Sequence, residues 1–264
     1  MSTRRGRGAL AALGATLRRP QEARSLRRKA VVAVLGMHRS GTSAIAGMLQ
    51  EHGVELGPVS EEARFNARGN REIRDLNRLH NSILERNGGS WWKPPLDPRL
   101  ERRDFRRRDE ILSTIPGRTI GVKDPRMLLL LDLWQGLDPK PIGVIRNPVA
   151  VRASLERRAR ERGERHPQLS AAEWERLWTA YNRALLSELE RQPFPVIDFD
   201  RHSELDAQVR SALAFHGLEG EAESSFFDRE LVGHHVEEWR SQVVSTEALD
   251  LWDELARRAL MSPA

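Results

Sequence analysis

The residues best suited to chemistry lie in a loop closed by two glycines, Gly36 and Gly41. Six apolar residues precede this loop, and an apolar helical pattern begins near Thr42. Glycines allow a tight turn whose backbone N–H groups point inward, and the start of a helix adds the positive end of its dipole. The sequence therefore predicts a cradle that binds an anion over residues 40–43.

The same loop departs from the P-loop of ATP- and GTP-binding proteins. Its glycine spacing matches that motif, but Thr42-Ser43 follows Gly41 where the motif requires Lys-Ser or Lys-Thr. The lysine that would reach the β- and γ-phosphates is absent, and a cation stands instead at Arg39. Because a strand, a turn and a helix can share this pattern for packing reasons alone, the interpretation depends on a second motif.

That second motif spans Ile142 to Ser154. Arg146 follows a run of branched apolar residues, Asn147 is a suitable helix cap, and Pro148 fits the first helical turn. Ser154 lies about two turns into the helix, with its side chain tilted toward the helix start. We therefore expect Arg146 and Ser154 to approach one phosphate group.

Both motifs resemble those of one enzyme family. The order Arg39-Ser-Gly-Thr-Ser43 is similar to the 5′-phosphosulfate loop of the sulfotransferases. An arginine followed eight positions later by a serine, here Arg146 and Ser154, resembles the pair that binds the 3′-phosphate of 3′-phosphoadenosine 5′-phosphosulfate (PAPS) in that family. Weaker similarities are found in residues 69–77, 89–92, 123–126, 214–218 and 226–231, where His216 and Arg229 depart from the family pattern.

The resemblance implies a bacterial-type, PAPS-dependent enzyme that moves a sulfuryl group to a hydroxyl or amine of a glycan or small-molecule acceptor. It implies a P-loop-like α/β fold, a central parallel sheet flanked by helices on both faces, and no obligatory metal. The residues that the resemblance assigns to the PAPS donor are His38, Arg39, Ser40, Gly41, Thr42, Ser43, Arg146 and Ser154.

Sulfuryl transfer needs groups that accept the acceptor's proton and stabilise the departing phosphate. Arg39 and the loop amides suit the second task, and Lys123 could hold a sulfate or bridging oxygen. Our first choice of base is Glu72, at a helix start, where its alternative role is to compensate the helix dipole.

The second choice of base is Asp124, at the carboxyl end of a strand, where α/β sheets place their ligands. The alternative role of Asp124 is an ion pair with Arg126 or Arg146. A histidine such as His234 becomes the candidate if neither carboxylate serves.

The elements that must position these residues alternate along the chain. Apolar runs predict strands at 31–35, 119–122, 141–145 and 195–199, and amphipathic patterns predict helices over 71–87 and 174–189. We expect Trp174, Trp178 and Tyr181 to belong to the core. The charged run 102–109 predicts a solvated helix face.

Composition is that of a globular α/β enzyme, with 39% hydrophobic and 31% charged residues among 264. Residues 30–264 are expected to form a single domain. The absence of cysteine excludes disulfides, thiolate zinc sites and cysteine nucleophiles and suits a cytoplasmic protein. The histidines show no ligand spacing, since His234 and His235 are adjacent, so no metal site is expected.

The basic charge is concentrated in residues 1–29, which hold nine basic residues and one acidic residue, a net charge of +8. The remaining 235 residues hold 34 basic and 37 acidic side chains, so the body is slightly acidic and no nucleic-acid partner is expected. The apolar stretch 8–17 is too short to span a bilayer. We interpret residues 1–29 as a flexible extension that is either simply solvated or in weak contact with an anionic membrane surface.

Two alternatives from other classes stay open at this stage. One is a P-loop kinase or phosphotransferase that uses ATP, with Asp198 in the place of a magnesium-holding acid. The other is a non-catalytic nucleotide- or nucleic-acid-binding protein. A loop with Trp91, Trp92, Pro94 and Pro95 offers either an apolar wall for the acceptor or a packed surface loop.

Overall fold

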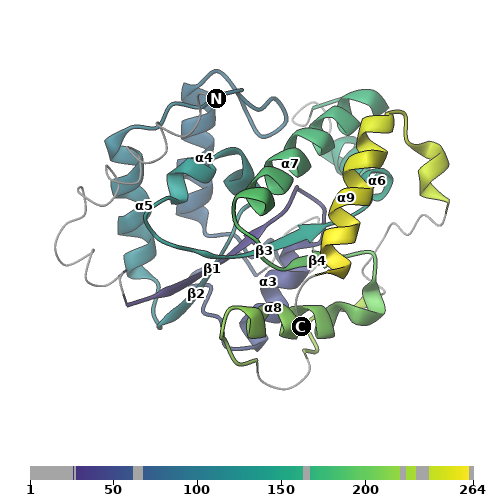
Figure 1. Ribbon diagram of the computed structural model, residues 1–264. Helices are drawn as coiled ribbons and strands as arrows, with labels where there is room; N and C mark the ends of the chain where they lie inside the picture. Colours follow the sequence, from purple (N-terminus) through teal and green to yellow (C-terminus); the bar gives the residue numbers. More distant parts are fainter. Residues whose placement is uncertain are drawn as a thin grey trace.

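Four parallel strands form the central sheet of the computed structural model (Figure 1), which describes Leu26 and residues 28–61, 68–162, 167–220, 224–229 and 238–261. The order in the sheet is β2-β1-β3-β4, and neighbouring strands are parallel throughout. The strands are β1 (Ala30–Leu35), β2 (Thr119–Lys123), β3 (Lys140–Ile145) and β4 (Val196–Asp198). Each predicted strand is confirmed to within one residue at either end.

Helices cover both faces of the sheet because successive strand side chains point to opposite sides. In β1, Val32 and Val34 pack with α3 (Thr42–Glu51) and α8 (Leu205–Phe215). Val31, Ala33 and Leu35 belong to the larger core on the other face. The helices of that core are α4 (Arg74–Arg86), α5 (Arg102–Thr114), α6 (Pro148–Arg162), α7 (Ala171–Arg191) and α9 (Thr246–Leu260). The predicted α/β class is therefore confirmed.

Short 3-10 helices complete the described elements. They are η1 (Pro125–Leu129), η2 (Leu131–Trp134), η4 (His202–Glu204) and η6 (Trp239–Gln242). The amphipathic patterns correctly predicted α4 and α7. Trp174, Trp178 and Tyr181 on α7 are all buried, as the sequence predicted.

The prediction that residues 102–109 form a solvated helix face is wrong in part, because only some of these residues on α5 are exposed. Asp104, Arg108 and Asp109 are buried, while the arginines at 102, 103, 106 and 107 are exposed. Arg108 Nη2 lies 2.6 Å from Asp109 Oδ1, and Arg108 Nη1 donates to the Leu133 carbonyl. The five donors of a guanidinium can be satisfied by such partners, and this pairing allows the charges to be buried.

The described fold begins before the predicted boundary at residue 30. Leu26 is buried in the larger core, and Lys29 Nζ donates to the carbonyls of Ile115 at 2.6 Å and Gly117 at 2.9 Å. Residues 1–25 of the basic extension, as well as His234 and His235, lie outside the described residues. Within the described chain, no helix combines the length and the apolar character needed to cross a membrane.

The sheet order determines where a ligand can bind. Strand β1 lies between β2 and β3, so the loops that follow these three strands meet at one edge of the sheet. Open parallel sheets bind ligands at such a position, outside the carboxyl ends of the strands. The Gly36–Gly41 loop, Asp124 and Arg146 all follow these strand ends.

Candidate functional site

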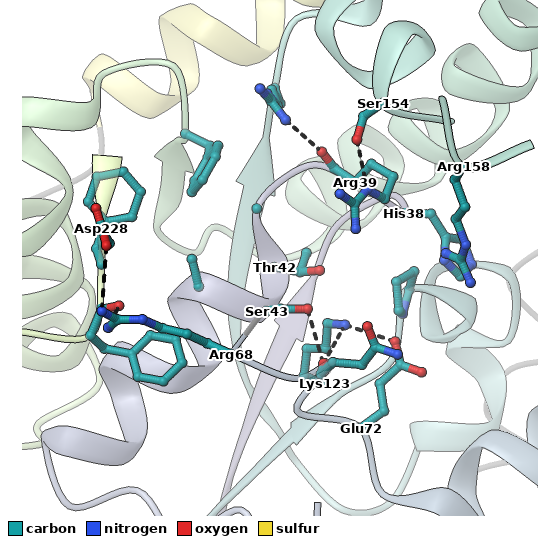
Figure 2. A pocket seen from close by; sticks show the side chains of 18 of the residues that line it. His38, Arg39, Thr42, Ser43, Arg68, Glu72, Lys123, Ser154, Arg158 and Asp228 are labelled. Atoms are coloured by element: carbon teal, nitrogen blue, oxygen red, sulfur yellow. Dashed lines mark hydrogen bonds and ion pairs between the residues drawn. The ribbon is translucent and has the colours of Figure 1, made fainter. Parts of the chain in front are cut away.

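A pocket lies at the carboxyl ends of β1, β2 and β3 (Figure 2). Nine of the eleven residues that the sequence predicted for the site line this pocket. They are His38, Arg39, Gly41, Thr42, Ser43, Glu72, Lys123, Arg146 and Ser154. The other two, Ser40 and Asp124, are buried outside the lining.

The cradle is formed by the turn from β1 into α3. Gly41 caps α3 with φ of 88°, and Arg39 also has a positive φ, of 69°. A Cβ atom on Gly41 would lie 2.2 Å from the Phe199 ring, so both the turn and the space require glycine. Among the described residues, no backbone carbonyl accepts from the N–H groups of Gly41, Thr42 or Ser43. These N–H groups, at a helix start, are therefore suited to an anion.

The backbone N–H of Ser40, which the sequence placed in the cradle, is engaged within the turn. Its backbone N–H donates to the Met37 carbonyl at 3.2 Å, and its residue surface is almost entirely buried. This hydrogen bond closes the turn, so the amide of Ser40 is already used. Within the predicted cradle, the N–H groups of residues 41–43 are therefore the ones with no backbone acceptor in the described part of the chain.

The glycine loop and the Arg146 motif meet across more than a hundred residues of sequence. Arg39 Nε donates to Ser154 Oγ at 2.8 Å, and Arg146 Nη1 donates to the Arg39 carbonyl at 3.2 Å (Figure 2). The loop after β1 and the start of α6 are thereby joined into a single group of polar side chains.

Both arginines of this group are cations in a buried setting. Burial and then the charges of Arg158 and Arg146 lower the pKa of Arg39 to about 10. Burial also lowers the pKa of Arg146, while Asp200, whose Oδ1 lies 3.7 Å from Arg146 Nε, opposes this shift. Both side chains remain charged near neutral pH, and gathering like charges in a desolvated pocket favours an anionic ligand.

The start of α6 is fixed by the loop after β4. Asn147 Oδ1 accepts the N–H of Ala150 at 2.8 Å, which is the predicted helix cap. Asp200 accepts from the Asn147 backbone N–H at 2.7 Å and from its side-chain Nδ2 at 3.1 Å. One carboxylate therefore holds both the cap of α6 and the neighbouring Arg146.

Glu72 and Lys123 form an ion pair elsewhere on the pocket wall. Lys123 Nζ donates to Glu72 Oε1 at 2.8 Å and to the Asn70 carbonyl at 2.9 Å. Asn77 Nδ2 donates to Glu72 Oε2 at 2.7 Å, and Ser43 Oγ donates to the Asn70 carbonyl at 3.0 Å. The carboxylate of Glu72 is thus oriented from both oxygens and linked to the cradle through Asn70.

Asp124 is held beneath the pocket as the partner of two buried groups. Arg126 Nη1 lies 2.8 Å from Asp124 Oδ1, and His80 Nδ1 lies 2.8 Å from Oδ2. Burial alone would raise the pKa of Asp124, but Arg126 and His80 keep it below its ordinary range. The geometry is that of an ion pair with Arg126, which was the alternative role of this residue.

His38 lines the pocket as a neutral imidazole. Its ring centroid lies 4.5 Å from that of Trp91 and 6.0 Å from that of Tyr181. Burial lowers the pKa of His38 well below its ordinary value, and the positive charges of Arg126 and Arg158 lower it further. Trp91 packs against the core, whereas the side chain of its neighbour Trp92 is exposed.

Several lining residues are missing from the sequence prediction. Arg157 and Arg158 follow Ser154 by three and four positions, so the helical period already places them on the same face of α6. Others come from segments distant in the sequence, namely Arg68, Phe199, Phe226, Phe227 and Asp228. No local pattern marks these residues as neighbours of the cradle.

Asp198, the acid of the kinase alternative, does not line the pocket. Its Oδ1 accepts the backbone N–H of Asp200 at 3.0 Å, and burial together with Asp200 raises its pKa to about 6. Over the described part of the chain, no three His, Asp or Glu side chains are grouped as a metal site.

Comparison with known proteins gives one structural similarity. No protein-family model matches the chain, and no curated protein matches it. Among solved structures, the chain is similar to the sulfotransferase domain from the Synechococcus PCC 7002 olefin synthase. The identity is 18% and the TM-score 0.49, and the alignment covers 86% of this chain and 96% of that domain.

Proposed function

We propose that this protein is a PAPS-dependent sulfotransferase that transfers a sulfuryl group to a hydroxyl or amine of a glycan or small-molecule acceptor. The observation that carries the proposal is the hydrogen bond from Arg39 to Ser154, which joins the glycine loop to the Arg146 motif in one pocket. A nucleotide with phosphates at both its 5′ and 3′ positions requires two such anion sites side by side.

The donor is assigned to the cationic part of the pocket. The N–H groups of residues 41–43 and the Arg39 guanidinium would hold the 5′-phosphosulfate. Arg146 and Ser154 would hold the 3′-phosphate, and His38 would border the donor as a neutral group. Lys123, beside the cradle, would contact the sulfate or the bridging oxygen.

The transfer itself is an in-line displacement at sulfur. The acceptor oxygen forms a bond to sulfur while the bond from sulfur to the bridging oxygen of the 5′-phosphate breaks, and that electron pair leaves with the phosphate. Arg39 and the loop amides stabilise the charge that develops there. Glu72 receives the proton of the acceptor, and Lys123 and Asn77 hold its carboxylate in place.

Calorimetry with four ligands tests the choice of nucleotide. We expect 3′-phosphoadenosine 5′-phosphate (PAP) to bind at least about tenfold more tightly than AMP, because only PAP offers a 3′-phosphate to Arg146 and Ser154. ATP with magnesium and a DNA oligomer complete the comparison. Equal affinities for PAP and AMP would overturn the proposal, and tight magnesium-dependent binding of ATP would favour a kinase.

Two arginine variants separate binding from turnover. Arg146→Ala should weaken PAP binding by about 1.5 to 3 kcal/mol, the usual value of a charge-assisted contact. Arg39→Ala should mainly lower turnover, because its charge matters most while the bridging bond breaks. Full activity in both variants, with unchanged circular dichroism, would contradict these assignments.

A pair of isosteric variants tests the base. Glu72→Gln keeps the side-chain shape but cannot accept the proton, so turnover of PAPS with a panel of hydroxyl acceptors should fall by about 10² to 10⁴ while PAP affinity stays nearly unchanged. Asp124→Asn is the comparison, with folding checked by thermal unfolding. A folded Asp124→Asn variant that is inactive beside an active Glu72→Gln variant would move the base to Asp124.

A further inference from the structure

A chain of side-chain hydrogen bonds runs from the candidate base to a buried arginine. Asn77 Nδ2 donates to Glu72 Oε2 at 2.7 Å, and Asn81 Nδ2 donates to Asn77 Oδ1 at 3.1 Å. Arg126 Nε donates to Asn81 Oδ1 at 2.7 Å. Glu72 lines the pocket, whereas the two asparagines and the arginine do not. Any influence of Asn81 on a bound molecule therefore passes through its neighbours.

The backbone fixes the relative positions of these groups. Asn77 and Asn81 are four residues apart on α4, so they are neighbours on one face of the helix. Arg126 lies on η1 and is 8% exposed. Its Nη1 is 2.8 Å from Asp124 Oδ1, and this buried ion pair holds the guanidinium in place. The chain thus begins at an anchored cation.

The two ends of the chain decide how both amides are turned. A guanidinium can only donate a hydrogen bond, and an ionised carboxylate can only accept one. Asn81 must therefore present its oxygen to Arg126, which leaves its Nδ2 for the oxygen of Asn77. Asn77 in turn has its own Nδ2 left for Glu72. A single direction of donation runs from Arg126 to Glu72, in agreement with the three hydrogen bonds of the chain.

This direction matters because only an ionised carboxylate can take a proton from an acceptor hydroxyl. A donor at Oε2 favours the ionised form of Glu72, whereas an amide oxygen at the same place would favour the protonated form. The charged groups that face this carboxylate are Lys123, 2.8 Å from Oε1, and Arg126, 3.9 Å from Oε2 (Figure 2 shows the lysine). The Asn77 amide is the closest group at Oε2.

We infer that Arg126 and Asn81 are positioning residues for the base: they hold the Asn77 amide with its N–H group toward Glu72 and thereby keep the carboxylate able to accept a proton. The inference rests on the proposed function, which makes Glu72 the base. It extends the active site to two residues that do not line the pocket.

Two variants of Asn81 provide the test. Asn81→Asp still accepts from Arg126 but offers no donor, so its carboxylate should attract the Asn77 N–H group and leave the amide oxygen against Glu72. Turnover of PAPS with the panel of hydroxyl acceptors should fall about tenfold or more, while PAP affinity and the unfolding temperature stay nearly unchanged. Asn81→Leu binds neither neighbour and leaves Asn77 free to donate to Glu72, so turnover should fall less.

A merely structural role of Asn81 predicts the reverse order, because leucine leaves the Arg126 Nε donor unpaired. Ser82→Asp is the control for charge: it adds a carboxylate at the next, exposed position of α4 and should leave turnover unchanged. The double variant Asn77→Leu/Asn81→Asp removes the turned amide, so it should be more active than Asn81→Asp alone. An Asn81→Asp variant that keeps full turnover, or is less impaired than Asn81→Leu, would overturn the inference.

The side-chain amide signals of Asn77 in NMR spectra give a readout that needs no acceptor. Asn77→Leu identifies these signals by their loss. Glu72→Gln should shift them in the otherwise unmodified protein, because the charge that they face is removed, and should shift them little in the Asn81→Asp background. Equal shifts in both backgrounds would contradict the inferred orientation.

Failure of the proposed function gives a different result. If PAP does not bind, the donor assignment is wrong, and the amide signals still decide whether Asn81 controls the orientation of Asn77. If PAP binds and PAPS is consumed, but Asn81→Asp and Asn81→Leu behave alike, only the positioning role is excluded.

Discussion

His38 shows how a single buried side chain links the site to the stability of the protein. Its imidazole is enclosed by Trp91 and Tyr181, and burial followed by the charge of Arg126 lowers its pKa well below the ordinary value. Below about pH 6.5 the His38 imidazole therefore becomes protonated in the unfolded chain while it stays neutral in the native protein. As far as His38 is concerned, the free energy of unfolding has its full value above that pH, and it decreases as the pH falls toward the native pKa.

We predict that His38→Gln reduces the acid sensitivity of folding. The variant lacks the group that is protonated only after unfolding, so its free energy of unfolding should fall less between pH 7.5 and pH 5 than that of the unmodified protein. Urea unfolding at the two pH values gives the comparison. His216, whose pKa burial also lowers, is present in both proteins and cancels. Equal losses of stability in the two proteins would contradict the prediction.

At the scale of elements, the loop after β4 supports the turn from β3 into α6. Asp200 accepts two hydrogen bonds from Asn147 and lies 3.7 Å from Arg146, although it is more than fifty residues away in the sequence. A strand at one edge of the sheet thereby positions an arginine at the end of its neighbour. Asp200 thereby helps to hold the buried Arg146 cation in one orientation.

Under the proposed function, Asp200→Asn should therefore weaken the binding of the 3′-phosphate. The amide keeps the shape but loses the charge that faces Arg146, and we expect PAP affinity to fall about three- to tenfold while AMP affinity changes little. Calorimetry with both nucleotides measures the change. Glu204→Gln, at an exposed position on η4, is the control. Parallel losses for PAP and AMP would indicate a general loss of structure instead.

Helix α5 gives an energetic prediction at the same scale. Arg108→Leu leaves Asp109 buried without the guanidinium, and the free energy of unfolding should fall by about 3 to 5 kcal/mol. Arg107→Leu is the matched variant one position earlier, where half of the side chain is exposed, and should change stability by less than about 1 kcal/mol. Chemical denaturation measures both variants. Equal effects would show that the buried pair contributes no more than a surface pair.

At the scale of the whole molecule, Leu26 and Lys29 belong to the folded body of the protein. From its charge alone, the sequence predicts that both residues lie in the basic extension 1–29. Leu26 is 4% exposed and packs in the larger core. Lys29 donates hydrogen bonds to the carbonyls of Ile115 and Gly117, which follow α5. The basic character of residues 1–29 therefore does not mark the edge of the folded body. That edge is set by the burial of apolar side chains.

Leu26→Ala should accordingly destabilise the whole fold. Removal of a buried leucine side chain typically costs about 2 to 5 kcal/mol, and thermal unfolding would detect such a loss. Leu96→Ala, at a fully exposed leucine, is the control and should leave the unfolding temperature nearly unchanged. A silent Leu26→Ala variant would place the start of the folded body at or after residue 30.

The amino-acid sequence alone determined the local features of this protein. Runs of branched apolar residues predicted all four strands, and the 3.6-residue period predicted α4 and α7. The glycine at position 41 predicted the turn that starts α3, because its conformation is accessible to few other residues. These predictions succeeded because each depends on neighbours within a few residues along the chain.

Only the tertiary structure decided which charged groups are buried and what they meet. It paired Asp124 with Arg126 and His80, placed the N–H of Ser40 against the Met37 carbonyl, and brought Arg39 to Ser154 across 115 residues. It also added Phe199, Phe226 and Phe227 to the pocket lining, from segments that no local pattern connects to the loop. Burial, desolvation and ion pairing depend on what packs against a side chain, and that is set by the sheet order and the helices on its two faces.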